Sequence, residues 1–172
     1  DTIRFILNNA NKNYMVDDGV LYNKSGTEIV QYPKGSTDAT FTANVSNSSG
    51  NTNTVTSIRP YAFYGCENLT SVNISGVEKV GEYAFANACN LETITAQWLK
   101  DVSYESFSGT KWFENEWNNE SNNSQIVLSN CLLLYTDTEK DVMELRDLRS
   151  TVYYIAEQAF ASTQLETIYM PL

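Results

Sequence analysis

The chain has 172 residues, of which 42% are hydrophobic and 12% aromatic, so it can bury a core as a single domain. Its net charge of −10 argues against binding to nucleic acid or to anionic lipid, because both need clustered Lys and Arg. The absence of histidine excludes a Ser–His–Asp triad, a Cys–His dyad and a His-liganded zinc site.

The N-terminal residues have the pattern of a repeat strand. Residues 2–5 fit the second half of a strand of the type found at 93–96, so we expect the chain to begin inside a repeat. No basic segment followed by an apolar one opens the chain, which fits a mature or trimmed start.

The next segment, 14–35, predicts an inserted β-hairpin. Two alternating strands flank a polar turn that contains Gly26, and Pro33 ends the strand pairing. The long polar stretch that follows, 36–57, is predicted to be a connector.

The main signal is a tandem repeat in residues 58–113. The segments 58–74 and 80–96 share a Tyr-Ala-Phe core, and every apolar anchor of the second lies 22 residues beyond its equivalent in the first. A third copy keeps this interval as far as Phe107, and its register fails after Phe113. Units of this kind bury their apolar side only when stacked, with strands ~4.7–4.9 Å apart, and the interval lies within the ~20–29 residues of leucine-rich repeats.

The C-terminal third predicts a second hairpin and a return of the repeat. The inserted hairpin is expected within 126–146, with one strand at 130–135, a polar turn, and a return strand at 142–145. The repeat resumes over 155–172 and stops just past a strand with no polar capping unit. We therefore expect a truncated repeat that belongs to a longer array or pairs end to end.

The predicted fold is a β-rich α/β solenoid over residues 1–172, built from leucine-rich repeats of about 22 residues with inserted β-hairpins. Two columns of large side chains should run through its core. The first column is predicted to contain Phe63, Phe85, Phe107 and Phe160, and the second Leu69, Leu91, Phe113 and Leu165.

The motifs at 18–33, 58–74, 80–96 and 108–113 resemble those of the BspA-type leucine-rich-repeat proteins of bacterial cell surfaces. The resemblance implies a secreted or surface-attached adhesion protein whose ligand is an extracellular or host protein. We therefore expect a non-enzymatic binding module at the cell surface, with no catalytic residue, metal or cofactor and no insertion into the membrane.

Side chains that lie between the inward anchors of the repeat strands should point outward. As a hypothesis, they form a binding face built by the repeats, and the alternative is a solvated sheet face that binds nothing. The expected members of this face are Arg4, Ser71, Asn73, Thr93, Thr95, Thr167 and Tyr169.

Aromatic residues near the broken third repeat suggest a different function. Trp112 is expected to pack beneath the insertion, whereas Trp117 lies among acidic and amide residues and is the one expected to be exposed. An exposed Trp117 would suit a carbohydrate-binding surface module. A third possibility is a structural spacer without a ligand of its own.

The three cysteines leave two interpretations open. Cys66, Cys89 and Cys131 can all be buried free thiols, or Cys66 and Cys89 can form a disulfide between adjacent coils. Because 89 − 66 is 23 rather than 22, the two residues are offset by one position, which makes the geometry of a disulfide uncertain.

Overall fold

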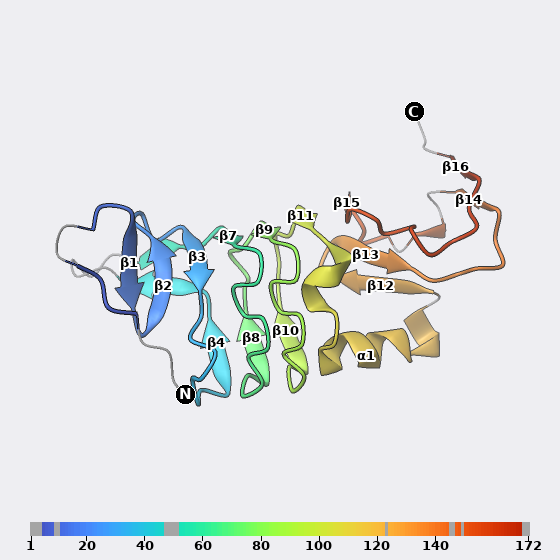
Figure 1. The fold of residues 1–172 in the computed structure, drawn as a ribbon. Coiled ribbons are helices and arrows are strands. Elements are labelled where there is room, and N and C mark those ends of the chain that lie inside the picture. Colours follow the sequence, from blue (N-terminus) through green and yellow to red (C-terminus); the bar gives the residue numbers. More distant parts are fainter. Residues whose placement is uncertain are drawn as a thin grey trace.

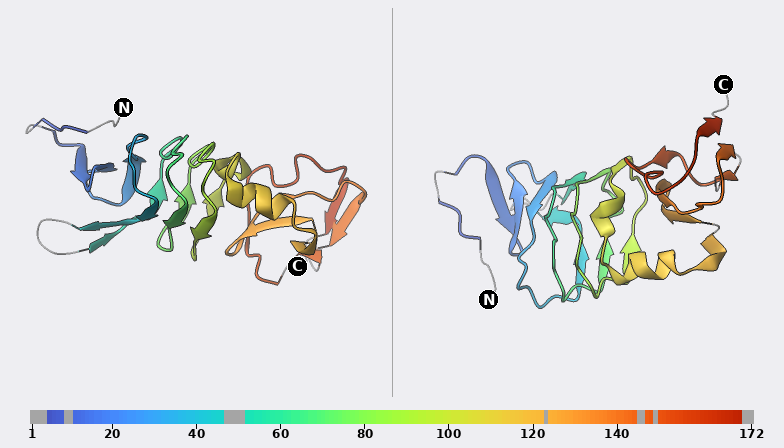
Figure 2. Two further views of the ribbon diagram at one scale, coloured as in Figure 1. Left: turned by 90° about the horizontal axis from the view of Figure 1, so that it is seen from below. Right: turned by 45° about the vertical axis from the view of Figure 1, so that its right-hand side comes forward.

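The computed structural model describes residues 5–8, 11–46, 52–122, 124–144, 147–148 and 150–169. The chain winds into an elongated solenoid whose coils succeed one another from the N-terminal to the C-terminal end (Figure 1). Figure 2 shows the same succession of coils from two other sides.

Short strands dominate the described residues, and helical segments are few. The strands are β1 (Tyr14–Asp17), β2 (Val20–Asn23), β3 (Glu28–Gln31), β4 (Thr40–Thr42), β5 (Asn44–Ser46), β6 (Thr52–Thr54), β7 (Ser57–Ile58), β8 (Ser71–Asn73), β9 (Lys79–Val80), β10 (Thr93–Thr95), β11 (Asp101–Val102), β12 (Gln125–Leu128), β13 (Cys131–Tyr135), β14 (Val142–Glu144), β15 (Tyr154–Ile155) and β16 (Thr167–Tyr169). The helices are α1 (Lys111–Trp117) and two 3₁₀ segments, η1 (Tyr104–Phe107) and η2 (Glu120–Asn122).

Two sheets form the walls of the solenoid. The larger sheet has the order β1-β2-β3-β7-β9-β11, and the smaller one has the order β10-β8-β4. All neighbours from β3 to β11 and all three strands of the smaller sheet are parallel. Parallel pairing of β8 with β10 sets Val72 opposite Ile94, so the repeat register predicted from the sequence is confirmed.

Aromatic rings stack along the core of the successive coils. The ring centroids of Phe63 and Phe85 lie 4.6 Å apart, and those of Phe85 and Phe107 lie 5.4 Å apart. The ring of Tyr32 continues the stack beyond Phe63 at 4.9 Å. The predicted column is therefore confirmed for the three tandem coils.

The fourth predicted member of that column, Phe160, lies elsewhere. It is half-buried, and its ring packs against Tyr135 at 5.9 Å. The backbone N–H of Tyr135 donates to the carbonyl of Ala159, just as that of Tyr32 donates to Ala62. Phe160 therefore belongs to a new aromatic contact with the β12–β13 hairpin and lies outside the stack of Phe63, Phe85 and Phe107.

The third coil ends in a helix in place of a strand. The Thr110 hydroxyl caps α1 by accepting a hydrogen bond from the N–H of Phe113 at 3.1 Å. Trp112 is buried and meets the edge of Phe107, as expected from the sequence, whereas Phe113 is only half-buried. Successive side chains rotate around a helix, so the apolar period of the preceding coils cannot continue here.

The second predicted column is therefore confirmed only in part. Leu69 and Leu91 are fully buried, whereas Phe113 and Leu165 are half-buried against the core. A strand does lie at Val142–Glu144, where the return strand was predicted, but its predicted pairing is wrong, because β13 pairs antiparallel with β12, and β14 pairs parallel with β16. All five residues of β13 are buried, so its sequence lacks the alternation of apolar and polar residues that could have indicated how the strand pairs.

The N-terminal part contains more structure than the sequence predicted. β2 and β3 form an antiparallel hairpin around the turn with Gly26, and β1 adds a further antiparallel strand. The predicted connector, 36–57, contains β4, which pairs parallel with β8, and the antiparallel pair of β5 and β6.

Candidate functional site

A ladder of small polar side chains covers the outward face of the smaller sheet. Register pairing aligns Thr40, Ser71 and Thr93 in one row, and it aligns Thr42, Asn73 and Thr95 in a second row. These side chains point outward because the central residue of each strand faces the core: Phe41 in β4, Val72 in β8 and Ile94 in β10. The hydroxyl ladder, as this set of six residues is called below, repeats a hydrogen-bonding group at each coil.

The structure brings together four of the residues predicted for a binding face. Ser71 is half-buried, and Asn73, Thr93 and Thr95 are exposed. The Asn73 side-chain oxygen accepts hydrogen bonds from the N–H and the hydroxyl of Ser75, which fixes the amide in one orientation. This one member of the ladder is thus held in place before any partner binds.

Two members of the ladder, Thr40 and Thr42, were missed in the sequence analysis. A signal for them exists, because Thr40-Phe41-Thr42-Ala43 closely matches Thr93-Ile94-Thr95-Ala96. An interval of 22 residues does not align the two segments, because the β5–β6 hairpin after β4 makes that coil longer than 22 residues.

The remaining predicted face residues do not join the ladder. Thr167 and Tyr169 lie on β16, opposite Val142 and Glu144 of β14, in a separate two-stranded sheet. Figure 1 places this sheet at the far end of the molecule from β4. Tyr169 is 61% exposed there, and Arg4 lies outside the described residues.

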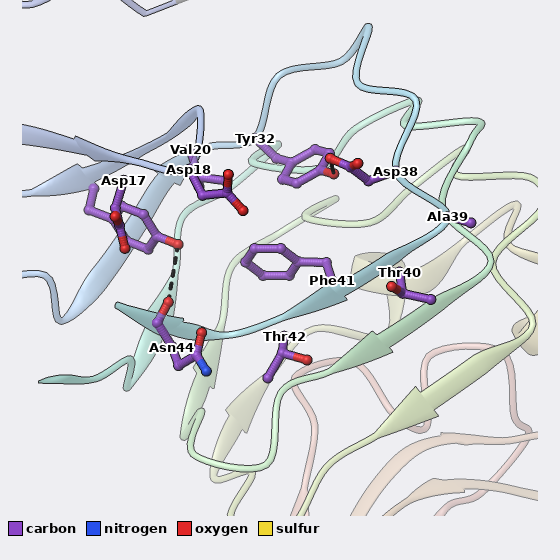
Figure 3. Close-up of a pocket in the computed structure, with 11 residues that line it drawn as sticks. Asp17, Asp18, Val20, Tyr32, Asp38, Ala39, Thr40, Phe41, Thr42 and Asn44 are labelled. Atoms are coloured by element: carbon purple, nitrogen blue, oxygen red, sulfur yellow. Dashed lines mark hydrogen bonds between the residues drawn. The ribbon is translucent and has the colours of Figure 1, made fainter. Parts of the chain in front are cut away.

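A hollow of about 450 Å³ opens beside β4, which is the edge strand of the smaller sheet. Figure 3 shows the Phe41 ring in the middle of it, with Tyr32 and Asp38 on one side and Asp17 and Asp18 on another. Two members of the hydroxyl ladder, Thr40 and Thr42, also line the hollow, so the two features are continuous.

The hollow is acidic. Its lining includes three aspartates and neither Lys nor Arg. The carboxylate of Asp38 accepts hydrogen bonds from the hydroxyls of Ser36 at 2.6 Å and Tyr32 at 3.5 Å. Burial, with the nearby carboxylates of Asp17 and Asp18, raises the pKa of Tyr22 above its usual value, so this phenol stays neutral at physiological pH. The arrangement therefore favours a cationic group over an anionic one.

Trp117, predicted as an alternative site, is exposed to 55% at the end of α1. Its ring stacks on Phe113 with the centroids 6.4 Å apart, and a hollow of about 320 Å³ lies beside it. Exposure of this ring agrees with the prediction.

The cysteines do not form the disulfide that the sequence left open. All three are free thiols, with Cys66 and Cys131 buried and Cys89 exposed. The expectation of three buried thiols is therefore wrong for Cys89, whose place one residue beyond the buried Ala88 puts it on the surface.

Alkylation of the native protein with iodoacetamide at pH 8 should modify Cys89 alone. Burial raises the pKa of Cys66 and that of Cys131 to about 12, so both stay protonated and shielded while the chain is folded. Mass spectrometry should show one added group on the native chain and three after unfolding without reductant. Only one added group on the unfolded chain would reveal a disulfide and contradict the structure.

The described residues contain no close group of three or more carboxylates or thiols suited to hold a metal ion. None of the helices in the described ranges has the length and apolarity needed to cross a bilayer.

The repeat geometry agrees with a comparison against protein families. Residues 37–148 match the family described as BspA type Leucine rich repeat region (6 copies). The chain belongs to this family. The matched region starts just before β4, so it includes the coil that the sequence analysis had taken for a connector. A comparison with curated protein sequences gives no match.

Several solved structures are similar to this chain at low sequence identity. The pneumococcal vaccine antigen PcpA is similar with a TM-score of 0.53 and 18% identity, over 94% of this chain and 31% of that chain. A leucine-rich repeat protein from Eubacterium ventriosum has a TM-score of 0.49 and 20% identity, over 96% of this chain and 54% of its own. A leucine rich cell surface protein from Faecalibacterium prausnitzii has a TM-score of 0.46 and 17% identity, over 92% and 54%. The chain thus spans about a third to a half of these proteins.

Proposed function

We propose that this chain is a non-enzymatic protein-binding or adhesion module of a bacterial cell-surface or secreted protein, and that the hydroxyl ladder is its binding face. The observation that carries this proposal is the register of β4, β8 and β10, which repeats small polar side chains on an open sheet face. Membership of the BspA-type family and the likeness to a vaccine antigen support a location outside the cell.

The chemistry of the ladder suits a protein partner. Thr and Ser lose little side-chain entropy when a partner covers them, because their side chains are short. Each hydroxyl donates one hydrogen bond and accepts others, so the backbone or side chains of a partner can pair with successive coils. The acidic hollow at the β4 end adds a preference for partners that carry Lys or Arg opposite it.

Binding should be measured by surface plasmon resonance against a panel of purified matrix and plasma proteins. The double variant Asn73→Ala and Thr95→Ala removes two neighbouring groups of one ladder row. Loss of two hydrogen bonds of ~0.5–1.5 kcal/mol each should weaken binding about fivefold or more.

The variant Thr167→Ala and Tyr169→Ala is the matched control, because it removes two exposed side chains from the separate two-stranded sheet of β14 and β16. It should leave the affinity unchanged. If neither pair of substitutions affects capture, the ladder is not the binding face. If the unmodified chain captures nothing, the spacer interpretation is favoured.

A further inference from the structure

A cluster of tyrosines lies on the segments that join the two sheets, away from the hydroxyl ladder. Tyr61 and Tyr64 belong to the connection between β7 and β8, and Tyr83 belongs to the equivalent connection between β9 and β10. Tyr61 is 49% exposed and Tyr64 is 39% exposed, which is high for large aromatic side chains in a well-packed coil. These three residues are called the tyrosine shelf below.

A hollow lies beside this shelf, where three successive coils meet. Tyr64, Ala86 and Ser108 occupy equivalent positions of three successive coils, 22 residues apart. The backbone N–H of Gly65 donates to the carbonyl of Ala86, and that of Asn87 donates to the carbonyl of Ser108, so the three coils lie side by side. A hollow of about 300 Å³ lies at this place. It is lined by Tyr61, Tyr64, Tyr83, Ala86, Asn87 and Ser108.

The walls of this hollow are fixed in position. The rings of Tyr61 and Tyr83 stack with their centroids 5.4 Å apart. The side-chain amide of Asn87 donates to the Tyr64 oxygen at 2.8 Å, and the Tyr83 hydroxyl donates to the carboxylate of Glu105 at 2.9 Å. A ligand would therefore meet an arranged surface and would not have to order these side chains itself.

The backbone holds two of these tyrosines in an unusual conformation. Tyr61 has a φ of 62° and Tyr83 a φ of 54°, in the left-handed region that bulky side chains rarely adopt. Gln158 has a φ of 62° at the equivalent position of a later coil, so the left-handed turn belongs to the repeat itself. Aromatic side chains at this turn are the specific feature of the two coils that carry the shelf.

The chemistry of the hollow favours a neutral ligand with one apolar face and a hydroxylated edge. Exposed phenol rings offer apolar faces with partial negative charge, against which the C–H groups of a sugar ring can pack. The phenol, amide and hydroxyl groups around them can donate and accept hydrogen bonds. Two of the neighbouring charges are already engaged, since Glu105 accepts from Tyr83 and the Lys34 ammonium lies 5.9 Å from the centre of the Tyr64 ring.

The size of the hollow also limits the ligand. From the coil of Tyr64 to that of Ser108 there are two strand spacings, or about 10 Å. A proline-rich helix rises ~3.1 Å per residue and would have only about three residues in such a space. One or two sugar rings fit it better than an extended peptide does.

We propose that this hollow is a binding site for a neutral pyranose unit of a glycan. The site goes beyond the protein-binding role proposed above, because it uses the tyrosine shelf and not the hydroxyl ladder. Either surface can therefore function without the other.

The test is a glycan array of neutral oligosaccharides probed with the whole chain, followed by calorimetric titration of the strongest binder. Tyr64→Ala and Tyr61→Ala each remove an exposed ring from the shelf. Each should weaken binding at least tenfold, with thermal unfolding measured to show that the variants are folded.

Trp117→Ala is the matched control, because it removes an exposed aromatic ring outside the shelf. It should leave glycan binding unchanged. Absence of any bound glycan would overturn the proposal, as would loss of binding in the Trp117 variant with the shelf variants unaffected. Binding of a proline-rich peptide to the shelf, with sugars silent, would also overturn it.

Discussion

Replacing Phe85 by alanine should lower the free energy of unfolding by about 3–5 kcal/mol. Phe85 is fully buried, and its ring stacks on Phe63 on one side and on Phe107 on the other. Its removal leaves a cavity between three coils, and both neighbouring rings lose a packing partner. Because each coil contacts only its neighbours, no distant part of the solenoid can fill that space.

Chemical denaturation followed by circular dichroism measures this loss. Phe160→Ala is the matched control, since it removes the same side chain from a half-buried site outside the stack. Its cost should be clearly smaller. A Phe85 variant no less stable than the Phe160 variant would contradict the assignment of Phe85 to the centre of the core.

The fixed interval of 22 residues was enough to predict the parallel register and the aromatic stack of the tandem coils. It failed where a coil carries an insertion. Phe41 pairs with Val72 across an interval of 72 − 41 = 31 residues, and Met143 pairs with Ile168 across 168 − 143 = 25. A search at one period cannot align such coils, although their three-residue strands have the same alternation of outward and inward side chains.

The candidate sites were also predicted only in part from the sequence. Alternation along a strand correctly identified Ser71, Asn73, Thr93 and Thr95 as neighbours on the outward face of one sheet. The acidic hollow was not predicted, because its aspartates come from the end of β1, from the β1–β2 turn and from the loop before β4, which only the fold brings together. The hollow of the tyrosine shelf was not predicted either, because its lining residues come from different coils that only the fold places side by side.

Close approach between coils requires glycine at position 81, and this makes a second prediction with a large expected effect. A Cβ atom at Gly81 would lie 2.4 Å from the backbone nitrogen of Pro60 and 2.6 Å from its Cδ. The N–H of Gly81 also donates to the carbonyl of Ile58 at 2.9 Å, so the two coils cannot separate without losing a hydrogen bond. Gly81→Ala should therefore cost about 1–3 kcal/mol, as overpacking commonly does.

Gly76→Ala separates this effect from the general consequence of adding a methyl group. Its Cβ would lie 2.8 Å from the methyl carbon of the exposed Thr54, which can rotate away, and 3.3 Å from the backbone oxygen of Val55, whereas a Cβ at Gly81 would lie 2.4 Å from the backbone nitrogen of Pro60. Denaturation curves should accordingly place the Gly76 variant nearer to the unmodified chain than the Gly81 variant. Equal loss of stability in the two variants would mean that the coils can move apart at Pro60. The structure argues against such a movement, because it would break the parallel pairing of Ile58 in β7 with Val80 in β9.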